Sequence, residues 1–161
     1  MRMTIACVGR AKAAAEQELC EAYLKRARAF GRKLGVFPIE LIVVETSRAP
    51  DAKARMAEEA DRLCKRIPSG ARRIVLDERG TALDSASFAA RLAALRDSGE
   101  RDLVFVIGGP DGLAPDLINK AEERLSLGPQ TWPHLLVRAM LAEQIYRSLT
   151  ILGGHPYHRG G

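Results

Sequence analysis

Consecutive glycines follow an apolar run at residues 107–112 (IGGPDG). Glycine lets a ligand approach the backbone closely, and α/β proteins bind ligands at the carboxyl ends of their sheet strands. The spacing matches neither the GxGxxG pattern of a dinucleotide site nor a P-loop, because no GK[ST] follows. The run therefore predicts a ligand-binding turn, with a plain connecting loop as the alternative.

A second stretch, 127–133 (LGPQTWP), combines a glycine, two prolines and the single tryptophan of the chain. Proline fixes the backbone and removes a donor, so such a stretch can form a rigid cleft wall with free N–H and C=O groups. This predicts a second part of a binding site. The alternative is a structural connection between a strand and a helix.

The third stretch is the tail 155–159 (HPYHR). Aromatic, imidazole and guanidinium groups together can stack on a base and hold a phosphate. A metal pair is disfavoured, because Pro156 prevents a regular helix through the two histidines and no cysteine is near. We therefore expect no metal site, and a frayed terminus is the alternative to a functional tail.

Length and composition predict one globular domain over residues 1–161. Hydrophobic residues make up 47% of the chain and charged residues 28%, an ordinary balance for a folded domain. No membrane span is expected, because no apolar run approaches the ~18 residues required. Cys7, Cys20 and Cys64 form no CxxC pair, which favours a reduced, cytoplasmic protein.

Strand and helix patterns alternate along the chain. Apolar β-branched runs predict strands at 2–8, 37–45, 73–76, 103–107 and 125–127. Helical spacing and capping residues predict helices at 13–34, 52–67, 85–97, 115–124 and 134–152. The alternation favours an α/β fold with a largely parallel sheet flanked by helices.

The last predicted helix, 134–152, is apolar on most of its sides. A surface helix needs an apolar stripe of only about 100°. The helix is therefore either central in the monomer or packed against a second copy of the chain, and we favour a symmetric homodimer.

The net charge of +5 arises in residues 1–35, which hold eight basic and three acidic side chains. The first helix would carry much of this charge on Arg26, Arg28, Arg32 and Lys33. Such a patch is typical of a surface that faces nucleic acid. A solvated helix face is the alternative.

Taken in order, these motifs resemble those of one family. The matching stretches are 73–77 (RIVLD), 105–113 (FVIGGPDGL), 125–127 (LSL), 132–134 (WPH), 136–138 (LVR), 143–147 (EQIYR) and 155–159 (HPYHR). Together they resemble the bacterial ribosomal RNA large-subunit methyltransferase H family, which is part of the SPOUT class of knotted methyltransferases. The resemblance covers essentially the whole chain.

The resemblance implies a fold, a cofactor and a substrate. The α/β sheet would carry a deep trefoil knot at its C-terminal end, and S-adenosyl-L-methionine (SAM) would bind in the knot. The protein would be a homodimer whose sites are completed across the interface. The substrate would be a pseudouridine of 23S ribosomal RNA, methylated at ring N3 in the assembled 70S ribosome.

Residues can be assigned to the implied site where they match the family's motifs. The cofactor-binding residues would be Leu76, Gly108, Leu127, Gly128, Pro129, Gln130, Thr131 and Trp132. The catalytic residues would be Arg138, His155, Tyr157, His158 and Arg159. An arginine would stabilise negative charge on the base, a histidine would accept the N3 proton and the tyrosine would orient the base.

Three other functions remain open at this point. The chain could be a non-catalytic ribosome-binding or RNA-binding factor built on the same knot. It could be a SAM-dependent methyltransferase of tRNA, which is less favoured because the chain has no appended RNA-binding domain. It could also be a nucleotide-binding α/β protein that uses the glycine turn.

Overall fold

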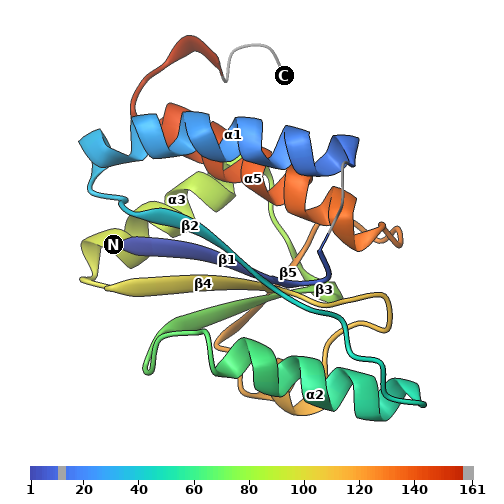
Figure 1. Cartoon of the computed structure of the whole chain (residues 1–161). Helices are drawn as coiled ribbons and strands as arrows, with labels where there is room; N and C mark the ends of the chain where they lie inside the picture. The colour runs from blue at the N-terminus through green and yellow to red at the C-terminus, as the bar shows by residue number, and fades with distance from the viewer. Residues whose placement is uncertain (11–13, 158–161) are drawn as a thin grey trace.

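The computed structural model describes residues 1–10 and 14–157 and is built around one parallel sheet (Figure 1). The strands lie in the order β2-β1-β4-β3-β5. They are β1 (Arg2–Val8), β2 (Ile39–Val44), β3 (Arg72–Ala82), β4 (Asp102–Ile107) and β5 (Glu123–Ser126). The helices are α1 (Ala15–Gly31) with a 3-10 turn (Arg32–Leu34), α2 (Ala52–Cys64), α3 (Ser85–Asp97), α4 (Pro115–Asn119) and α5 (His134–Leu152). The α/β prediction with a parallel sheet is confirmed.

Helices cover both faces of the sheet because its central strands are apolar on both sides. Along β1, Met3, Ile5 and Cys7 join one buried cluster, whereas Ala6 and Val8 join another. Side chains of a strand point alternately to opposite faces, so each cluster belongs to one face. α1, α3 and α5 pack on the first face, and α2 lies on the second (Figure 1).

α5 is covered mainly by its own chain. It packs against α1 and α3, and Leu141, Ala142, Ile145 and Leu149 are fully buried. A central position in the monomer therefore accounts for much of the apolar surface that the sequence shows. Part of α5 stays uncovered around Met140, next to a groove described below.

The predicted elements differ from the structure mainly around β3. The strand predicted at 73–76 is longer in the structure, because β3 continues to Ala82. Both Leu76 and Thr81 pair with Leu125 of β5, so the residues between them bulge out of the ladder. The helix predicted at 115–124 ends at Asn119, because the chain after it pairs with β3 as β5.

Two helix starts follow from side-chain caps that the sequence shows. Asp51 accepts a hydrogen bond from the N–H of Ala54 at 2.8 Å, and Asp84 accepts one from Ser87 at 2.7 Å. These carboxylates satisfy backbone donors that have no partner within the helix. In the described part of the chain, none of these helices combines the length and apolar character needed to cross a bilayer.

Candidate functional site

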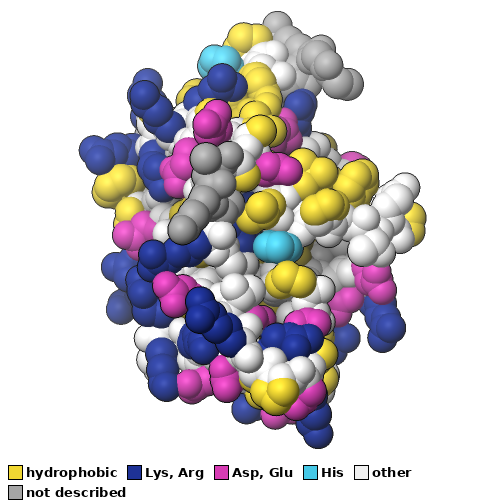
Figure 2. Space-filling model, turned by 45° about the vertical axis from the view of Figure 1, so that its right-hand side comes forward, with side chains coloured by type: hydrophobic (Ala, Val, Ile, Leu, Met, Phe, Trp, Pro, Cys, Tyr) yellow, Lys and Arg dark blue, Asp and Glu magenta, His cyan; other side chains and the backbone are white. Residues whose placement is uncertain are grey.

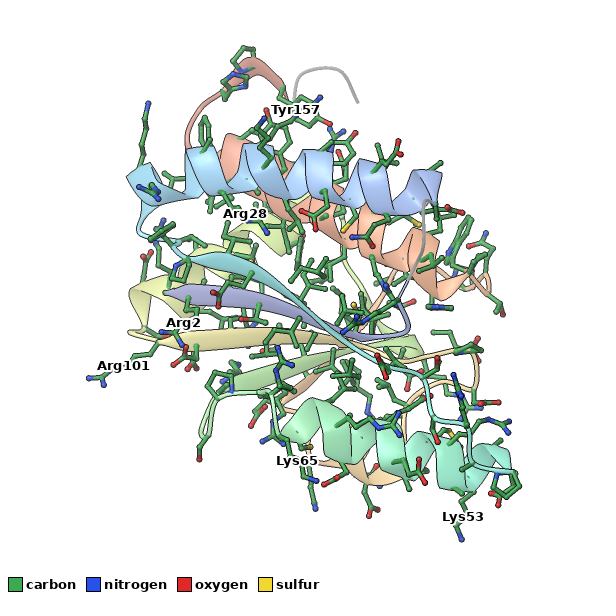
Figure 3. All side chains as sticks on the ribbon, viewed as in Figure 1. Arg2, Arg28, Lys53, Lys65, Arg101 and Tyr157 are labelled. Atoms are coloured by element: carbon green, nitrogen blue, oxygen red, sulfur yellow. The ribbon has the colours of Figure 1, made fainter. Side chains whose placement is uncertain are left out.

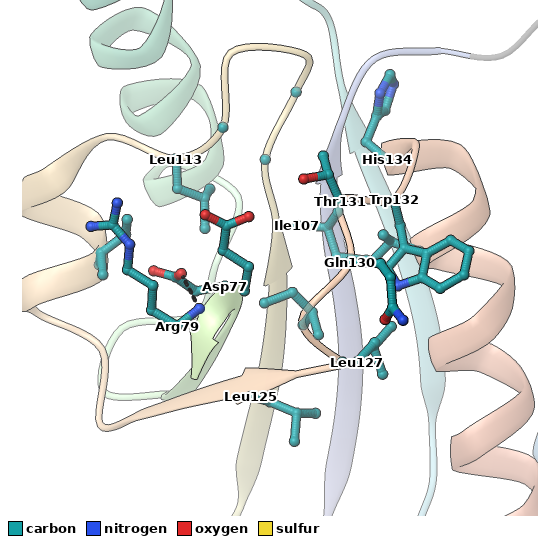
Figure 4. A pocket seen from close by; sticks show the side chains of 18 of the residues that line it. Asp77, Arg79, Ile107, Leu113, Leu125, Leu127, Gln130, Thr131, Trp132 and His134 are labelled. Atoms are coloured by element: carbon teal, nitrogen blue, oxygen red, sulfur yellow. Dashed lines mark hydrogen bonds between the residues drawn. The ribbon is translucent and has the colours of Figure 1, made fainter. Parts of the chain in front are cut away.

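A cavity of about 420 Å³ opens at the carboxyl edge of the sheet. Its walls come from the β3 bulge, the turn after β4, the connection between β5 and α5, and the first turn of α5 (Figure 4). These segments are far apart in sequence, but parallel strands end at one edge and bring them together. The volume lies within the ~300–1,000 Å³ typical of small-molecule sites.

The cavity gathers most of the residues that the family resemblance assigns to the cofactor. Seven of them line it: Leu76, Gly108, Leu127, Gly128, Gln130, Thr131 and Trp132. Pro129 lies in the same connection but not among the lining residues. Apolar side chains from β4 and β5 complete the walls, so the cavity offers both a surface for a flat ring and several backbone groups.

The turn after β4 is tight enough to require glycine. A Cβ on Gly108 would lie 2.5 Å from the carbonyl carbon of Gly112 and 2.9 Å from the nitrogen of Leu113. The turn is closed by a 3.0 Å hydrogen bond from the N–H of Gly112 to the carbonyl of Gly109. Gly112 therefore folds back on the Gly108-Gly109 pair, and the turn forms one side of the cavity.

The connection after β5 is held by Ser126, which is a residue that the motif analysis missed. Its Oγ accepts a hydrogen bond from the N–H of Gly128 at 3.1 Å and lies 2.9 Å from the Gly128 carbonyl oxygen. Gly128 has φ +112°, which favours glycine. A serine two residues before a glycine is the available sequence signal.

Polar side chains from the β3 bulge face the opposite wall. Asp77, Glu78 and Arg79 line the cavity, and Asp77 accepts a 2.9 Å hydrogen bond from the N–H of Arg79 (Figure 4). In the sequence, Asp77 and Glu78 form an acidic pair after the strand predicted at 73–76, which by itself is a common feature. The structure shows that the bulge turns this pair toward the glycine turn.

Asp111 of the glycine turn is paired with Arg55 of α2. Arg55 Nε lies 2.7 Å from Asp111 Oδ2 and Nη2 lies 3.0 Å from Oδ1, a two-point contact. The hydrogen bond from Arg55 lowers the pKa of Asp111. Arg55 is a site residue that sequence reasoning missed, because the two residues are 56 positions apart.

His134 and Arg138 occupy the first turns of α5. His134 lines the cavity, and burial, together with the charge of Arg138, lowers its pKa, so the imidazole is neutral near pH 7. Arg138 is 1% exposed and does not line the cavity. One of its nitrogens donates to the carbonyl of Val8, while Nε and Nη1 have no hydrogen-bond partner among the described residues. In this monomer Arg138 thus sits behind the cavity wall.

The predicted catalytic tail lies at the other end of α5. The 19 residues of α5 place its two ends roughly 27 Å apart. Tyr157 lies over the α1–α5 layer on the side away from the sheet (Figure 3). His155 packs edge-on against Phe30 of α1 at 5.6 Å between ring centroids, and its Nδ1 accepts from the N–H of Tyr157. His158 and Arg159 lie outside the described residues.

Tyr157 is positioned by two side chains of α5. Its hydroxyl donates to Glu143 at 3.1 Å, and Glu143 also accepts from Arg147 Nε at 2.9 Å. The Arg147 guanidinium lies 5.0 Å from the centre of the Tyr157 ring. Burial raises the pKa of Tyr157, helped by neighbouring Tyr23 and Glu143, so the phenol is protonated at neutral pH. It is therefore a hydrogen-bond donor rather than a base.

An apolar groove of about 640 Å³ joins the two regions. It shares Leu125, Leu127 and Gly128 with the cofactor-sized cavity and extends along α5 to Glu143. Large apolar side chains at its rim are exposed to solvent, with Leu19 at 46% and Leu83 at 39%. Apolar side chains exposed along a groove are typical of a docking face.

Fewer basic side chains are fully exposed at the predicted first helix than the sequence indicates. Arg28 is partly used inside the molecule, because its Nε donates to the carbonyl of Ile39 at 2.8 Å (Figure 3). Arg26, Arg32 and Lys33 are exposed. Figure 2 shows basic and acidic side chains intermixed over one face of the molecule.

Among residues 1–10 and 14–157, no three His, Cys, Asp or Glu side chains are grouped to hold a metal ion.

A match to a known family identifies the class of protein that has this fold and cavity. Residues 1–158 match a family model described as "Predicted SPOUT methyltransferase". The chain belongs to this family of methyltransferases. The C-terminal trefoil knot of the predicted fold is inferred from membership of this family.

Curated relatives are similar over nearly their full length. "Ribosomal RNA large subunit methyltransferase H" of Rhodopseudomonas palustris strain HaA2 is 51% identical over 159 residues, covering 99% of both chains. The protein of that name from Xanthobacter autotrophicus is 52% identical, again with 99% of both chains covered. These matches confirm the family resemblance that the motifs indicate.

Solved structures share the fold at much lower identity. A probable methyltransferase from Bordetella pertussis has a TM-score of 0.50 at 16% identity, covering 91% of this chain and 95% of the other. A probable methylase family protein from Haemophilus influenzae has a TM-score of 0.51 at 13% identity, covering 96% of this chain and 69% of the other. At this identity the likeness concerns the fold alone.

Proposed function

We propose that the protein uses SAM to methylate N3 of a pseudouridine in 23S ribosomal RNA within assembled 70S ribosomes of the cytoplasm. The main observation behind this proposal is the cavity at the carboxyl edge of the sheet. It collects seven residues expected to bind the cofactor, in a chain whose curated relatives carry the name of a ribosomal RNA methyltransferase.

The cavity residues fit SAM. Apolar walls at Leu76, Leu127 and Trp132 suit a purine ring, and the glycine turn leaves its backbone open to the ligand. Asp77 and Glu78 provide negative charge for a cofactor that carries a sulfonium and an ammonium group. When bound, SAM supplies an electrophilic methyl group. Pro129 would act on the shape of the connection rather than by contact.

We propose that a homodimer brings the catalytic tail to the cavity. The tail of one monomer lies a helix length away from the cavity of the same monomer. In a two-fold pair with antiparallel α5 helices, the end of one helix lies beside the start of the other. The groove along α5 is the proposed contact, because it carries exposed Leu19 and Leu83 and leads from the cavity to Glu143.

The tail would then complete the site from the partner subunit. Tyr157 would orient the base through its ring and hydroxyl, with Glu143 and Arg147 holding it in place. His155, His158 and Arg159 are the proposed groups for accepting the N3 proton and stabilising the anion. Arg138 would act indirectly, because its buried guanidinium holds the end of β1 beside His134.

Docking on the ribosome would use positive charge on α1 and on the 3-10 turn that follows it. Arg26, Arg32 and Lys33 are exposed and suit phosphate contacts. Arg28 contributes less, because it is already bonded to the Ile39 carbonyl.

Transfer of labelled methyl from SAM tests this proposal. The substrates are ribosomes lacking the modification, separate subunits, free ribosomal RNA and tRNA. We expect label in 23S RNA of assembled 70S ribosomes and little in the other substrates. Label in tRNA would move the activity to tRNA, and SAM binding without transfer to any RNA would favour a non-catalytic binding factor.

A further inference from the structure

α2 presents two side chains toward the glycine turn of the cavity, although α2 itself contributes nothing to the cavity lining. Arg55 and Glu59 are four residues apart and therefore share a helix face. Arg55 binds both oxygens of Asp111. Glu59 is 3% exposed, and its Oε2 would lie 3.0 Å from a Cβ placed on Gly109.

Arg55 is itself held on its other side. Its Nη1 donates to the carbonyls of Ala49 at 3.2 Å and Pro50 at 3.3 Å, in the connection that enters α2. The Arg55 side chain is 29% exposed and that of Asp111 26%. The guanidinium thus ties three segments together, and one of them is the turn that forms a cavity wall.

We infer that Arg55 is a positioning residue for cofactor binding, which it supports by fixing Asp111 and the glycine turn in the conformation that SAM requires. The inference rests on the proposed use of the cavity for SAM. Two physical effects favour it. A pre-formed turn does not have to be ordered when the ligand binds. Pairing also keeps the Asp111 carboxylate on Arg55 rather than free in the cavity beside Asp77.

The two-point contact requires a planar fork, which lysine lacks. Arg55→Lys keeps the charge but loses the paired geometry, so it should bind SAM more weakly than the wild type. Arg55→Ala and Asp111→Ala should each weaken SAM binding about fivefold. This estimate lies between the contribution of an exposed ion pair and that of a hydrogen-bonded charge. The double variant should be no weaker than either single one, since the same contact is lost.

Arg62 of α2 gives a matched control. It donates to the carboxylate of Glu58 at 3.2 Å and to the carbonyl of Glu45 at 2.8 Å, but it does not contact the glycine turn. Arg62→Ala removes a similar ion pair and a similar backbone contact from the same helix. A general effect on stability should therefore be comparable in the two variants.

The test is titration calorimetry of SAM with the intact protein, together with methyl transfer at varied SAM. For Arg55→Ala and Arg55→Lys we expect a raised Kd and KM for SAM, a nearly unchanged kcat at saturating SAM and an unchanged KM for ribosomes. Arg62→Ala should match the wild type. Wild-type affinity in both Arg55 variants, or additive losses in the double variant, would overturn the inference alone. Failure of the wild type to bind SAM would overturn the proposed function and this inference with it.

Discussion

Gly108→Ala probes the tightest point of the cavity wall. The new Cβ would lie 2.5 Å from the carbonyl carbon of Gly112 and 2.6 Å from its oxygen, whereas ordinary contacts begin at 3.4 Å. The turn must therefore move by about 0.9 Å or more, and the atoms that must move are backbone atoms. Overpacking of this kind costs about 2 kcal/mol. If most of that cost falls on the ligand-ready turn, SAM affinity drops about 30-fold.

The assay is SAM titration with thermal unfolding measured in parallel. Gly99→Ala is the control, because Gly99 has φ +86° in the turn between α3 and β4, and apart from its chain neighbours no described residue has an atom within 4 Å of a new Cβ. It should lower stability by about 1 kcal/mol through backbone strain and leave SAM affinity unchanged. Equal loss of SAM affinity in both variants, or none in Gly108→Ala, would refute the reasoning about the turn.

Three further changes test the tail, the groove and the buried imidazole. Tyr157→Phe removes the donor to Glu143 and should lower kcat about tenfold without changing SAM affinity; an unchanged rate would exclude the hydroxyl from the reaction. Leu19→Glu places a charge in the groove and should give monomers in sedimentation, while Ala57→Glu on exposed α2 should not. The folded pKa of His134 lies below its ordinary 6.5, so unfolding free energy should fall as pH drops below about 6.5. His134→Gln should flatten that slope in denaturant titrations, and an unchanged slope would contradict the assignment.

Most elements of the fold follow from local sequence. β1 and α5 lie where the apolar patterns place them, at Arg2–Val8 and His134–Leu152. β3 does not, because its second half is held by pairing with β5 rather than by its own propensity. Acidic residues and a glycine disfavour a strand locally, but a bulge allows the chain to re-enter the ladder at Thr81.

The site divides in the same way. Residues adjacent in sequence, such as those around Gly108 and Gly128, are predictable because turn chemistry is local. The contact of Arg55 with Asp111 and the burial of Arg138 depend on how distant elements pack, and no spacing rule encodes them. The sequence shows the motifs of both the tail and the cavity wall. That these two regions lie at opposite ends of α5 is visible only in three dimensions.

The shared wall between groove and cavity has a thermodynamic consequence. Leu125, Leu127 and Gly128 belong to both, so a second subunit in the groove would pack against the backbone that holds the cofactor. If the partner stabilises that wall and so strengthens SAM binding, SAM binding must strengthen dimerisation by the same factor, because linkage is reciprocal. The cofactor would therefore favour the same assembly that brings Tyr157 to the substrate, and a free monomer would be poor at both tasks. In the proposed dimer, two partial sites would thus be combined into a complete one.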